Sequence, residues 1–348
     1  MSDQRRRSEP ADTMRGRASE NGVTLWLLME ANRWVVAGLL LVGIFVVLLV
    51  VGMLDPEPLP ITQGSKDPVE TLFQGMVTAI ITGVTLVVTI NQLVLSQELG
   101  AVGDQRNRME DALDFRNDVE SHMDEDVSPV DPASFFRALL DSMRDDAAAL
   151  STAADARVHD EQGRSVADFA DELVVHVNEV ERKLDGAQFG TFDVISAILD
   201  FNYSYNIYEA RRLRSAAGDD LSSESADRLD SLLTELQLFG PAREHFKTLY
   251  FQWELIGLSR AMLYTAMPAL TTAVAMILFF DTAGSLPGVT LGVGNILWLV
   301  LGAAMLSITP FVLLVSYILR IATIARRTLA MGPFILRETG RETGDGSE

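Results

Sequence analysis

Four long runs of residues without a single charge interrupt this chain, and they limit its fold more than any other feature of the sequence. The clearest, WVVAGLLLVGIFVVLLVVGML, covers residues 34–54; the others cover residues 72–95, 261–280 and 291–319. At about 1.5 Å per residue, a helix of roughly 20 residues spans a hydrocarbon layer about 30 Å thick. The first run is longer than the apolar core of a signal peptide and lies farther from the N-terminus. We therefore predict an all-α integral membrane protein with four transmembrane helices.

The arginines that flank these runs predict the orientation of the chain. They gather before the first run and after the last, whereas the short loops 55–71 and 281–290 contain Lys66 as their only basic residue. By the positive-inside rule, both termini are then cytoplasmic and both short loops are external, in a multi-pass protein of the cell membrane. We expect three arginines to lie at the inner headgroups and to pair with anionic lipid: Arg320, Arg326 and Arg327.

This topology divides the chain into five parts. Residues 1–21 and 328–348 are polar termini that we expect to be mostly disordered, the first of them basic. Residues 22–98 hold an interfacial helix and the first two spans, residues 99–258 form an acidic cytoplasmic insertion between spans two and three, and residues 259–327 hold the last two spans. The first span is aliphatic on all sides, which predicts a peripheral position facing lipid.

Charge is as unevenly distributed as hydrophobicity. Asp and Glu total 48 against 28 Lys and Arg, a net charge of −20, and the insertion alone holds 33 acidic and 15 basic residues. Only three basic residues are lysines. Such an acidic, lysine-poor surface keeps a protein hydrated in a salt-rich cytoplasm, so we expect a halophilic archaeon as the source. The acidity also argues against nucleic-acid binding. The absence of cysteine excludes disulfides, thiolate nucleophiles and cysteine metal sites.

The insertion has helical apolar spacing throughout, and its start and stop signals predict a bundle. Asp131-Pro132 is typical of an N-cap followed by a first-turn proline, Ser165 with Asp168 resembles a capping box, and Gly240-Pro241 is a typical helix end. The predicted helices are a continuation of the second span to about residue 126, and then residues 131–155, 165–186, 191–217, 222–240 and 241 into the third span. The first and last of them would be stalks of membrane helices.

A polar stripe runs along the second span. Its members recur at intervals of three or four residues, so at about 100° per residue they fall within a sector of roughly 80° on a helix. They are Thr71, Gln74, Thr78, Thr82, Thr85, Thr89, Gln92 and Ser96. None is charged, which argues against a proton relay or a charge-coupled carrier.

Two interpretations of this stripe remain open. A hydroxyl or amide inside a membrane needs a partner, so the stripe is not expected to face acyl chains. In one interpretation, copies of the helix surround an axis and the stripe lines a water-filled pore. In the other, the stripe is a tight seam between helices, because Thr can bond its own i−4 carbonyl and Gly75, Ala79 and Gly83 allow close approach.

The third and fourth spans carry weaker signals. A row of small residues from Ala261 to Ala275 is typical of a packing seam. Pro268 in the third span and Pro310 in the fourth each remove a backbone hydrogen bond, so both are candidate hinges, although prolines are ordinary in membrane helices.

Motifs for catalysis are missing. We find no phosphate-binding loop, dinucleotide fingerprint, hydrolase elbow or zinc-protease motif, and we expect neither an enzyme nor a bound cofactor. Glu172, His176 and Glu179 share one helix face and could ligate a metal, but in so acidic a chain such a coincidence is expected, and we predict no metal site. The aromatic segment 201–208, followed by three arginines, could form a partner surface; core packing is the favoured interpretation.

The layout of charge-free spans, a large helical insertion between spans two and three, and a polar second span resembles that of bestrophin-like anion channels. The resemblance is architectural and implies no particular site residues. We expect a homo-oligomer in membrane lipid, a channel in the leading hypothesis, with Thr78, Thr82, Thr85 and Thr89 lining its conduit and Gln92 and Ser96 at its inner mouth. The alternative is a non-conducting membrane-anchored sensor or scaffold whose acidic insertion binds a soluble partner.

Overall fold

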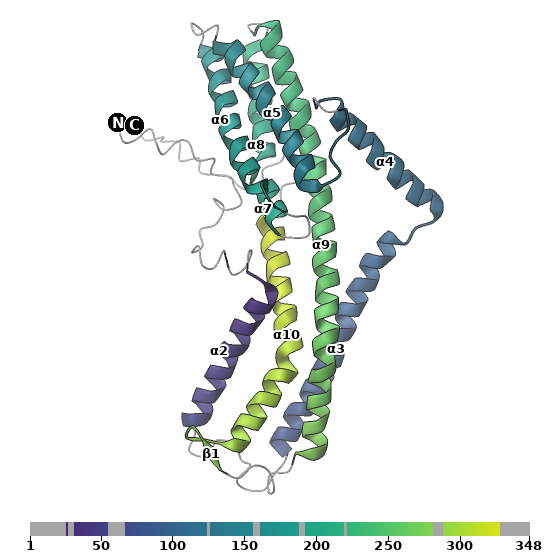
Figure 1. The fold of residues 1–348 in the computed structure, drawn as a ribbon, viewed down its shortest axis with the longest axis vertical. Coiled ribbons are helices and arrows are strands. Elements are labelled where there is room, and N and C mark those ends of the chain that lie inside the picture. The colour runs from purple at the N-terminus through teal and green to yellow at the C-terminus, as the bar shows by residue number, and fades with distance from the viewer. Residues whose placement is uncertain are drawn as a thin grey trace, which may run out of the picture. The chain divides into compact units, whose positions relative to one another are not determined.

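Helices make up almost the whole described chain, in agreement with the helical spacing of its apolar residues (Figure 1). The computed structural model describes residue 26 and residues 31–54, 67–123, 126–155, 161–187, 192–218, 221–280 and 288–327. Before the first span, where the interfacial helix is expected, this part includes only Trp26 and residues 31–33. The polar termini lie outside it. The chain divides into two units: residues 23–100 with 251–323, and residues 101–250 with the chain ends.

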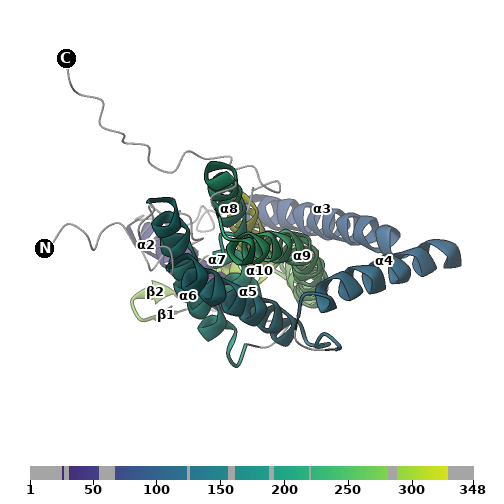
Figure 2. The ribbon, with the colours of Figure 1, turned by 90° about the horizontal axis from the view of Figure 1, so that it is seen from above.

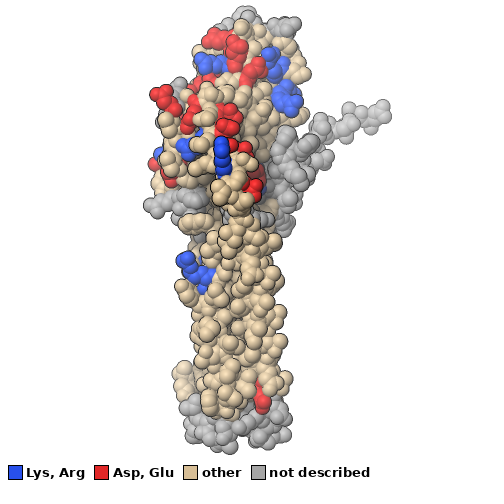
Figure 3. Space-filling view, turned by 90° about the vertical axis from the view of Figure 1, so that its right-hand side faces the viewer, with Lys and Arg blue, Asp and Glu red and all other residues tan. Residues whose placement is uncertain are grey.

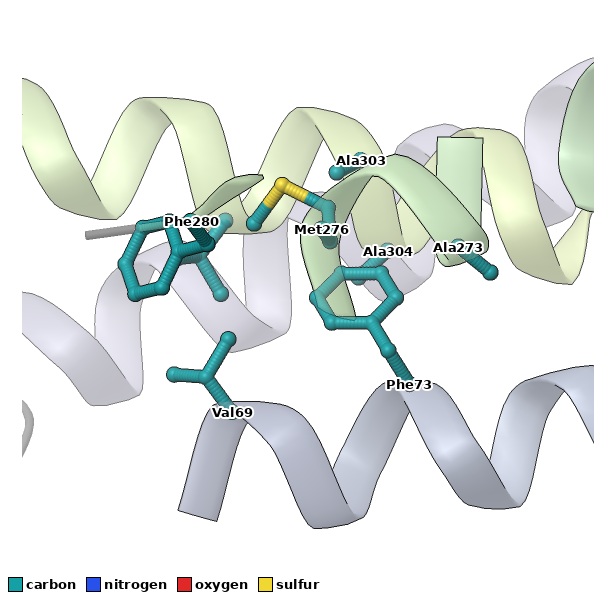
Figure 4. Close-up of a cluster of buried hydrophobic side chains, with 8 residues drawn as sticks. Val69, Phe73, Ala273, Met276, Phe280, Ala303 and Ala304 are labelled. Carbon is teal, nitrogen blue, oxygen red and sulfur yellow. The ribbon is translucent and has the colours of Figure 1, made fainter. Parts of the chain in front are cut away.

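The apolar unit contains the four predicted apolar helices. They are α2 (Arg33–Leu54), α3 (Asp67–Glu98), the C-terminal part of α9 (Ser223–Phe279) and α10 (Asn295–Arg327). All four are long and apolar enough to cross a membrane, which confirms the prediction at the level of length and composition. Near one end of the unit, Val69 and Phe73 of α3 pack against Ala273 and Met276 of α9 and against α10 (Figure 4).

A two-residue hairpin precedes α10. Strands β1 (Val289–Thr290) and β2 (Val293–Gly294) pair antiparallel around Leu291 and Gly292, whose φ angles of 55° and 79° are those of a type I′ turn. Because the hairpin takes residues 289–294, α10 begins at Asn295. The predicted start of the fourth apolar helix at residue 291 was therefore wrong by four residues.

The second unit is a helical bundle around an aromatic core. It consists of α4 (Val102–Glu120), α5 (Pro132–Asp155), α6 (Glu161–Leu184), α7 (Phe192–Asp200), α8 (Tyr203–Ala217) and the N-terminal part of α9. The rings of Phe136 and Phe201 lie 5.3 and 4.7 Å from that of Phe239. Helix α4 stands apart from the others in Figure 2, and Val119 is its only buried residue. Charged side chains crowd this unit, whereas the surface of the apolar unit in Figure 3 is nearly free of them.

Several predicted helix ends are confirmed by their capping contacts. Asp131 Oδ2 accepts a hydrogen bond from Ser134 N at 2.9 Å, and Ser222 Oγ accepts one from Ser225 N at 3.0 Å. Gly186 follows the end of α6 with a φ of 74°, the left-handed conformation that only glycine adopts freely.

Three predicted boundaries before α9 were wrong. Helix α3 ends at Glu98 and α4 begins at Val102, because Gly100 is a poor helix former and Ala101 is extended, so α3 does not continue to residue 126. The predicted helix 191–217 is two helices, since the side chain of Asn202 accepts a hydrogen bond from Tyr205 N and caps α8. Ser165 lies inside α6, which already begins at Glu161.

Helix α9 also passes through Gly240-Pro241 without a break, contrary to the predicted boundary there. Pro241 removes one backbone hydrogen bond, but its ring is at the surface, and the buried Phe239 and Ala242 on either side hold the helix in the core. The small Gly240 is needed at this point because a β-carbon there would lie 2.8 Å from Cε2 of Tyr203. Packing therefore overrides the local stop signal.

Candidate functional site

The polar stripe of α3 lies entirely on the exposed side of that helix. All eight members, from Thr71 to Ser96, are exposed. The large apolar side chains that α3 buries against other helices are those of Val69, Phe73, Ile80 and Val87. At 100° per residue, these four lie almost opposite the stripe. Within one copy of the chain, the stripe is therefore not a seam between helices.

The threonine hydroxyls of the stripe are bonded to the backbone of their own helix. Thr78, Thr82, Thr85 and Thr89 each donate to the carbonyl oxygen four residues earlier, at 2.8 to 3.1 Å. Since a hydroxyl has one hydrogen, each Oγ1 keeps only lone pairs for an outside partner. The exposed stripe thus offers a row of hydrogen-bond acceptors. Near the other end of α3, Ser96 Oγ donates to Leu93 O at 2.7 Å in the same manner.

The glutamines extend the polar surface beyond the threonines. Gln74 Nε2 donates to Glu70 Oε1 at 3.1 Å, one turn away on the same helix. Gln92 is exposed on the stripe near the other end of α3. A carboxamide offers both donors and acceptors, so these two positions add donors to the acceptor row.

A buried cluster of charges joins three helices of the apolar unit, and no motif in the sequence predicted it. Arg33 Nη2 on α2 lies 2.9 Å from Glu254 Oε1 on α9, and Arg320 Nη1 on α10 lies 3.5 Å from the same oxygen. Both arginines also donate to the carbonyl of Ala31. Their side chains are 7% and 6% exposed, and that of Glu254 is 13% exposed. The ring of Tyr317 lies 5.8 Å from the guanidinium of Arg33.

This cluster corrects the expectation for Arg320. The arginine does not reach outwards to lipid headgroups, because its guanidinium is buried against Glu254 and a backbone carbonyl. A signal for the cluster was present in the sequence: Arg33 and Arg320 directly adjoin apolar runs, and Glu254 lies seven residues before the third run. The predicted topology brings these three ends to one membrane face. Arg326 and Arg327 lie in α10, but their side chains are outside the described part of the structure.

The two candidate hinge prolines lie within continuous helices, and the His176 group is not gathered around a metal site. Pro268 is exposed on α9 and Pro310 is buried in α10, and both helices run through them without interruption. His176 is buried, its Nε2 lies 3.1 Å from Asp200 O, and the exposed Glu172 and Glu179 do not join it in a metal site. Among the described residues, no group of three possible ligands lies together.

The aromatic segment 201–208 is divided between core and surface. Phe201 and Tyr203 are buried in the bundle, as core packing predicts, and Arg243 stacks over the Tyr203 ring at 4.4 Å. Tyr205 and Tyr208 are exposed. Two of the four aromatic rings therefore remain available as surface.

A buried carboxyl group on α9 is the most perturbed acid of the bundle. Glu235 is fully buried, and burial raises its pKa to about 8, with Asp145 and Asp146 adding to the effect and a hydrogen bond with Ser142 opposing it. Ser142 Oγ lies 2.5 Å from Glu235 Oε1 and 2.6 Å from His122 O. A single hydroxyl hydrogen cannot serve both oxygens, but a protonated Glu235 can donate to Ser142, which then donates to His122 O.

Fold and site together define a helical protein with four candidate membrane spans, one of which exposes a polar stripe, and an acidic helical bundle. The chain belongs to a family of unknown function (DUF7972), whose model matches residues 1–347. Neither a curated protein nor a solved structure matches it.

Proposed function

We propose that this protein is a homo-oligomeric channel in which copies of α3 surround an aqueous path lined by the polar stripe. One observation carries the proposal: all eight stripe residues face away from the helices that pack against α3 in the same chain. Polar groups at membrane depth are tolerated where they line a water-filled cavity or meet protein. Association of several copies through α3 turns the whole stripe away from lipid at once.

We further propose that the path favours cations. The four central threonines donate their hydrogens to the backbone and turn oxygen lone pairs outwards, and rings of such oxygens replace part of a cation's hydration shell. The insertion that follows α3 in the chain carries a large excess of acidic residues, which raises the local concentration of cations. The resemblance to anion channels implies the opposite ion, so the sign of the selectivity discriminates between the two arguments.

The positive-inside distribution of arginine supports cytoplasmic termini, a cytoplasmic bundle and the cell membrane as the location. With this orientation, the cluster of Arg33, Glu254 and Arg320 lies at the cytoplasmic ends of three spans. The acidic, lysine-poor composition supports a halophilic source, in which high salt screens the negative charges.

Recording of the purified protein in planar bilayers tests the channel. The double variant Thr82→Val/Thr85→Val removes two oxygens from the stripe while keeping the shape of the side chains. We expect the wild type to conduct, with a reversal potential that follows the cation gradient, and the double variant to conduct at least several-fold less. Thr271→Val is the matched control, because Thr271 is an exposed threonine of α9 that also donates to the carbonyl four residues earlier. Absence of conductance in the wild type, or equal conductance in the double variant, would contradict the proposal.

A second candidate is the non-conducting sensor or scaffold. It is favoured by the observation that the threonine hydroxyls are already bonded within α3, which lowers the cost of exposing them to lipid. The polar, exposed helix α4 would then offer a surface for a soluble partner. A monomer in lipid nanodiscs, measured by mass, together with an absence of conductance, would support this candidate.

A further inference from the structure

One arginine lies on the outer apolar face of α9. The exposed residues of this face recur at helical spacing along the apolar part of the helix and are Trp253, Ile256, Arg260, Leu263, Tyr264, Met267, Thr271, Val274 and Leu278. Arg260 is the only charged residue among them. Its neighbours at positions 258, 259 and 261 are buried against the other helices, so the arginine points away from the packed side of the unit.

Arg260 makes no hydrogen bond or ion pair within the described part of the chain. This distinguishes it from Arg33 and Arg320, which share Glu254 in the buried cluster. A guanidinium at the edge of a hydrocarbon layer is costly without a partner or access to water. Its counter-charge must therefore come from outside the described residues.

Helix geometry directs the Arg260 side chain towards one membrane interface. Side chains of a helix lean towards its N-terminus, which on α9 is the direction of Ile256, Glu254 and Trp253. Arg260 lies six residues, or about 9 Å along the axis, beyond Glu254. A long arginine side chain that extends along the helix covers most of this distance and brings the guanidinium towards the interface.

Aromatic residues mark the level that the guanidinium reaches. Trp253 is 58% exposed on the same face, and Trp34, 52% exposed on α2, adjoins the arginine that pairs with Glu254. Exposed tryptophans are typical of the headgroup level of a membrane. Beyond Arg260 the face carries no charged residue as far as Leu278, and its one exposed threonine, Thr271, donates its hydroxyl hydrogen to Met267 O. Such a face suits acyl chains rather than an acidic surface of a second protein.

We propose that Arg260 and Trp253 form a binding site for the phosphate of an anionic phospholipid, whose acyl chains lie along the apolar face between Leu263 and Leu278. The guanidinium provides the positive charge and paired N–H donors that fit a phosphodiester, and the exposed indole lies at headgroup depth. The site requires that α9 crosses the membrane, but it does not require that the protein conducts.

Quenching of tryptophan fluorescence by brominated lipids tests the site directly. The full chain is placed in phosphatidylcholine vesicles that contain either brominated phosphatidylglycerol or brominated phosphatidylcholine at equal mole fraction. Bromine on the acyl chains quenches the tryptophans that it contacts. We expect phosphatidylglycerol to associate about fivefold more strongly, the ratio for one basic side chain near a membrane surface, and the preference to weaken with added NaCl.

Three variants assign the preference to this site. Arg260→Gln should reduce the ratio to about one, whereas Arg260→Lys should keep much of it, because a single positive charge remains. Trp253→Phe should remove the excess quenching, because Trp253 is the tryptophan that shares the exposed face of α9 with Arg260. Arg211→Gln is the control, because it removes an exposed arginine from α8 of the bundle and should leave the ratio unchanged.

The proposal is overturned if the wild type shows no preference for phosphatidylglycerol, or if Arg260→Gln or Trp253→Phe keeps the full preference. It is also overturned if Arg260→Gln lowers the mass of the particle in nanodiscs, because Arg260 would then bind a second copy of the chain. Circular dichroism of each variant checks that the helices are intact. Since no conductance is measured, a failure of the channel proposal does not affect the result.

Discussion

The buried carboxyl of Glu235 makes the stability of the helical bundle depend on pH. Its pKa is about 8 in the folded chain and near 4.5 when the group is exposed to water. Between these values the folded chain holds a proton that the unfolded chain has lost, so stability falls as pH rises through this range. At about 1.4 kcal/mol per pKa unit, the loss reaches roughly 5 kcal/mol by pH 8 and changes little above it.

The variant Glu235→Gln isolates this contribution. Glutamine keeps the shape of the protonated acid and can donate to Ser142, but it cannot ionise. We expect the variant to be about as stable as the wild type at pH 5 and several kcal/mol more stable at pH 8. Asp145, Asp146 and the paired Arg228 remain in both proteins, so their contributions to stability cancel in the comparison.

Urea unfolding of the full chain in detergent micelles, followed by the helical circular dichroism signal between pH 5 and 8, measures the difference. Glu224→Gln removes an exposed carboxylate from the same helix and should follow the wild type at every pH. If the wild type and Glu235→Gln lose stability in parallel as pH rises, Glu235 is ionised in the folded chain and the explanation based on burial is wrong.

Three further predictions concern packing and charge. Glu254→Gln should destabilise the apolar unit by about 3–5 kcal/mol, because Arg33 and Arg320 lose their shared carboxylate. The thermal midpoint of unfolding in detergent measures the loss of stability, and an unchanged midpoint would contradict the prediction. Gly240→Ala should cost about 1–3 kcal/mol in urea unfolding, since the new β-carbon meets the Tyr203 ring, and Gly103→Ala on the open surface of α4 is the control. Raising KCl from about 0.1 to 1 M should increase the urea midpoint of unfolding. The added salt shortens the screening length from about 10 to 3 Å and so weakens the repulsion within a chain of net charge −20. A lower midpoint would refute the account of the acidic surface.

Features that depend on local composition could be predicted from the sequence. The apolar helices follow from long charge-free runs, and the caps at Asp131 and Ser222 follow from side-chain oxygens that accept from backbone N–H groups three residues later. The stripe on α3 also follows from the helical period alone. Whether the stripe faces the chain or its surroundings could not be predicted, because this depends on which face Phe73 and Ile80 bury against other helices.

Features that depend on contacts distant in the chain were missed or wrong. Arg33 and Arg320 are separated by most of the sequence and meet only after the helices pack, so a rule based on flanking charge assigned Arg320 to lipid. The continuity of α9 through Gly240 depends in the same way on the Tyr203 ring of another helix. The pairing of Glu235 with Ser142 is a contact between α9 and α5 that no local pattern marks.

Cysteine accessibility in intact membranes tests the central claim most directly, because the natural chain contains no cysteine. Single cysteines at Thr78, Thr82, Thr85 and Thr89 would be exposed to a charged, membrane-impermeant thiol reagent, with Ile90 as the control on the exposed side of α3 away from the stripe. Thiols react as thiolates and therefore need water. The account predicts rapid labelling at the four threonine positions and none at Ile90. Equal and slow labelling at all five positions would show that the stripe faces lipid or protein and that no aqueous path runs along it.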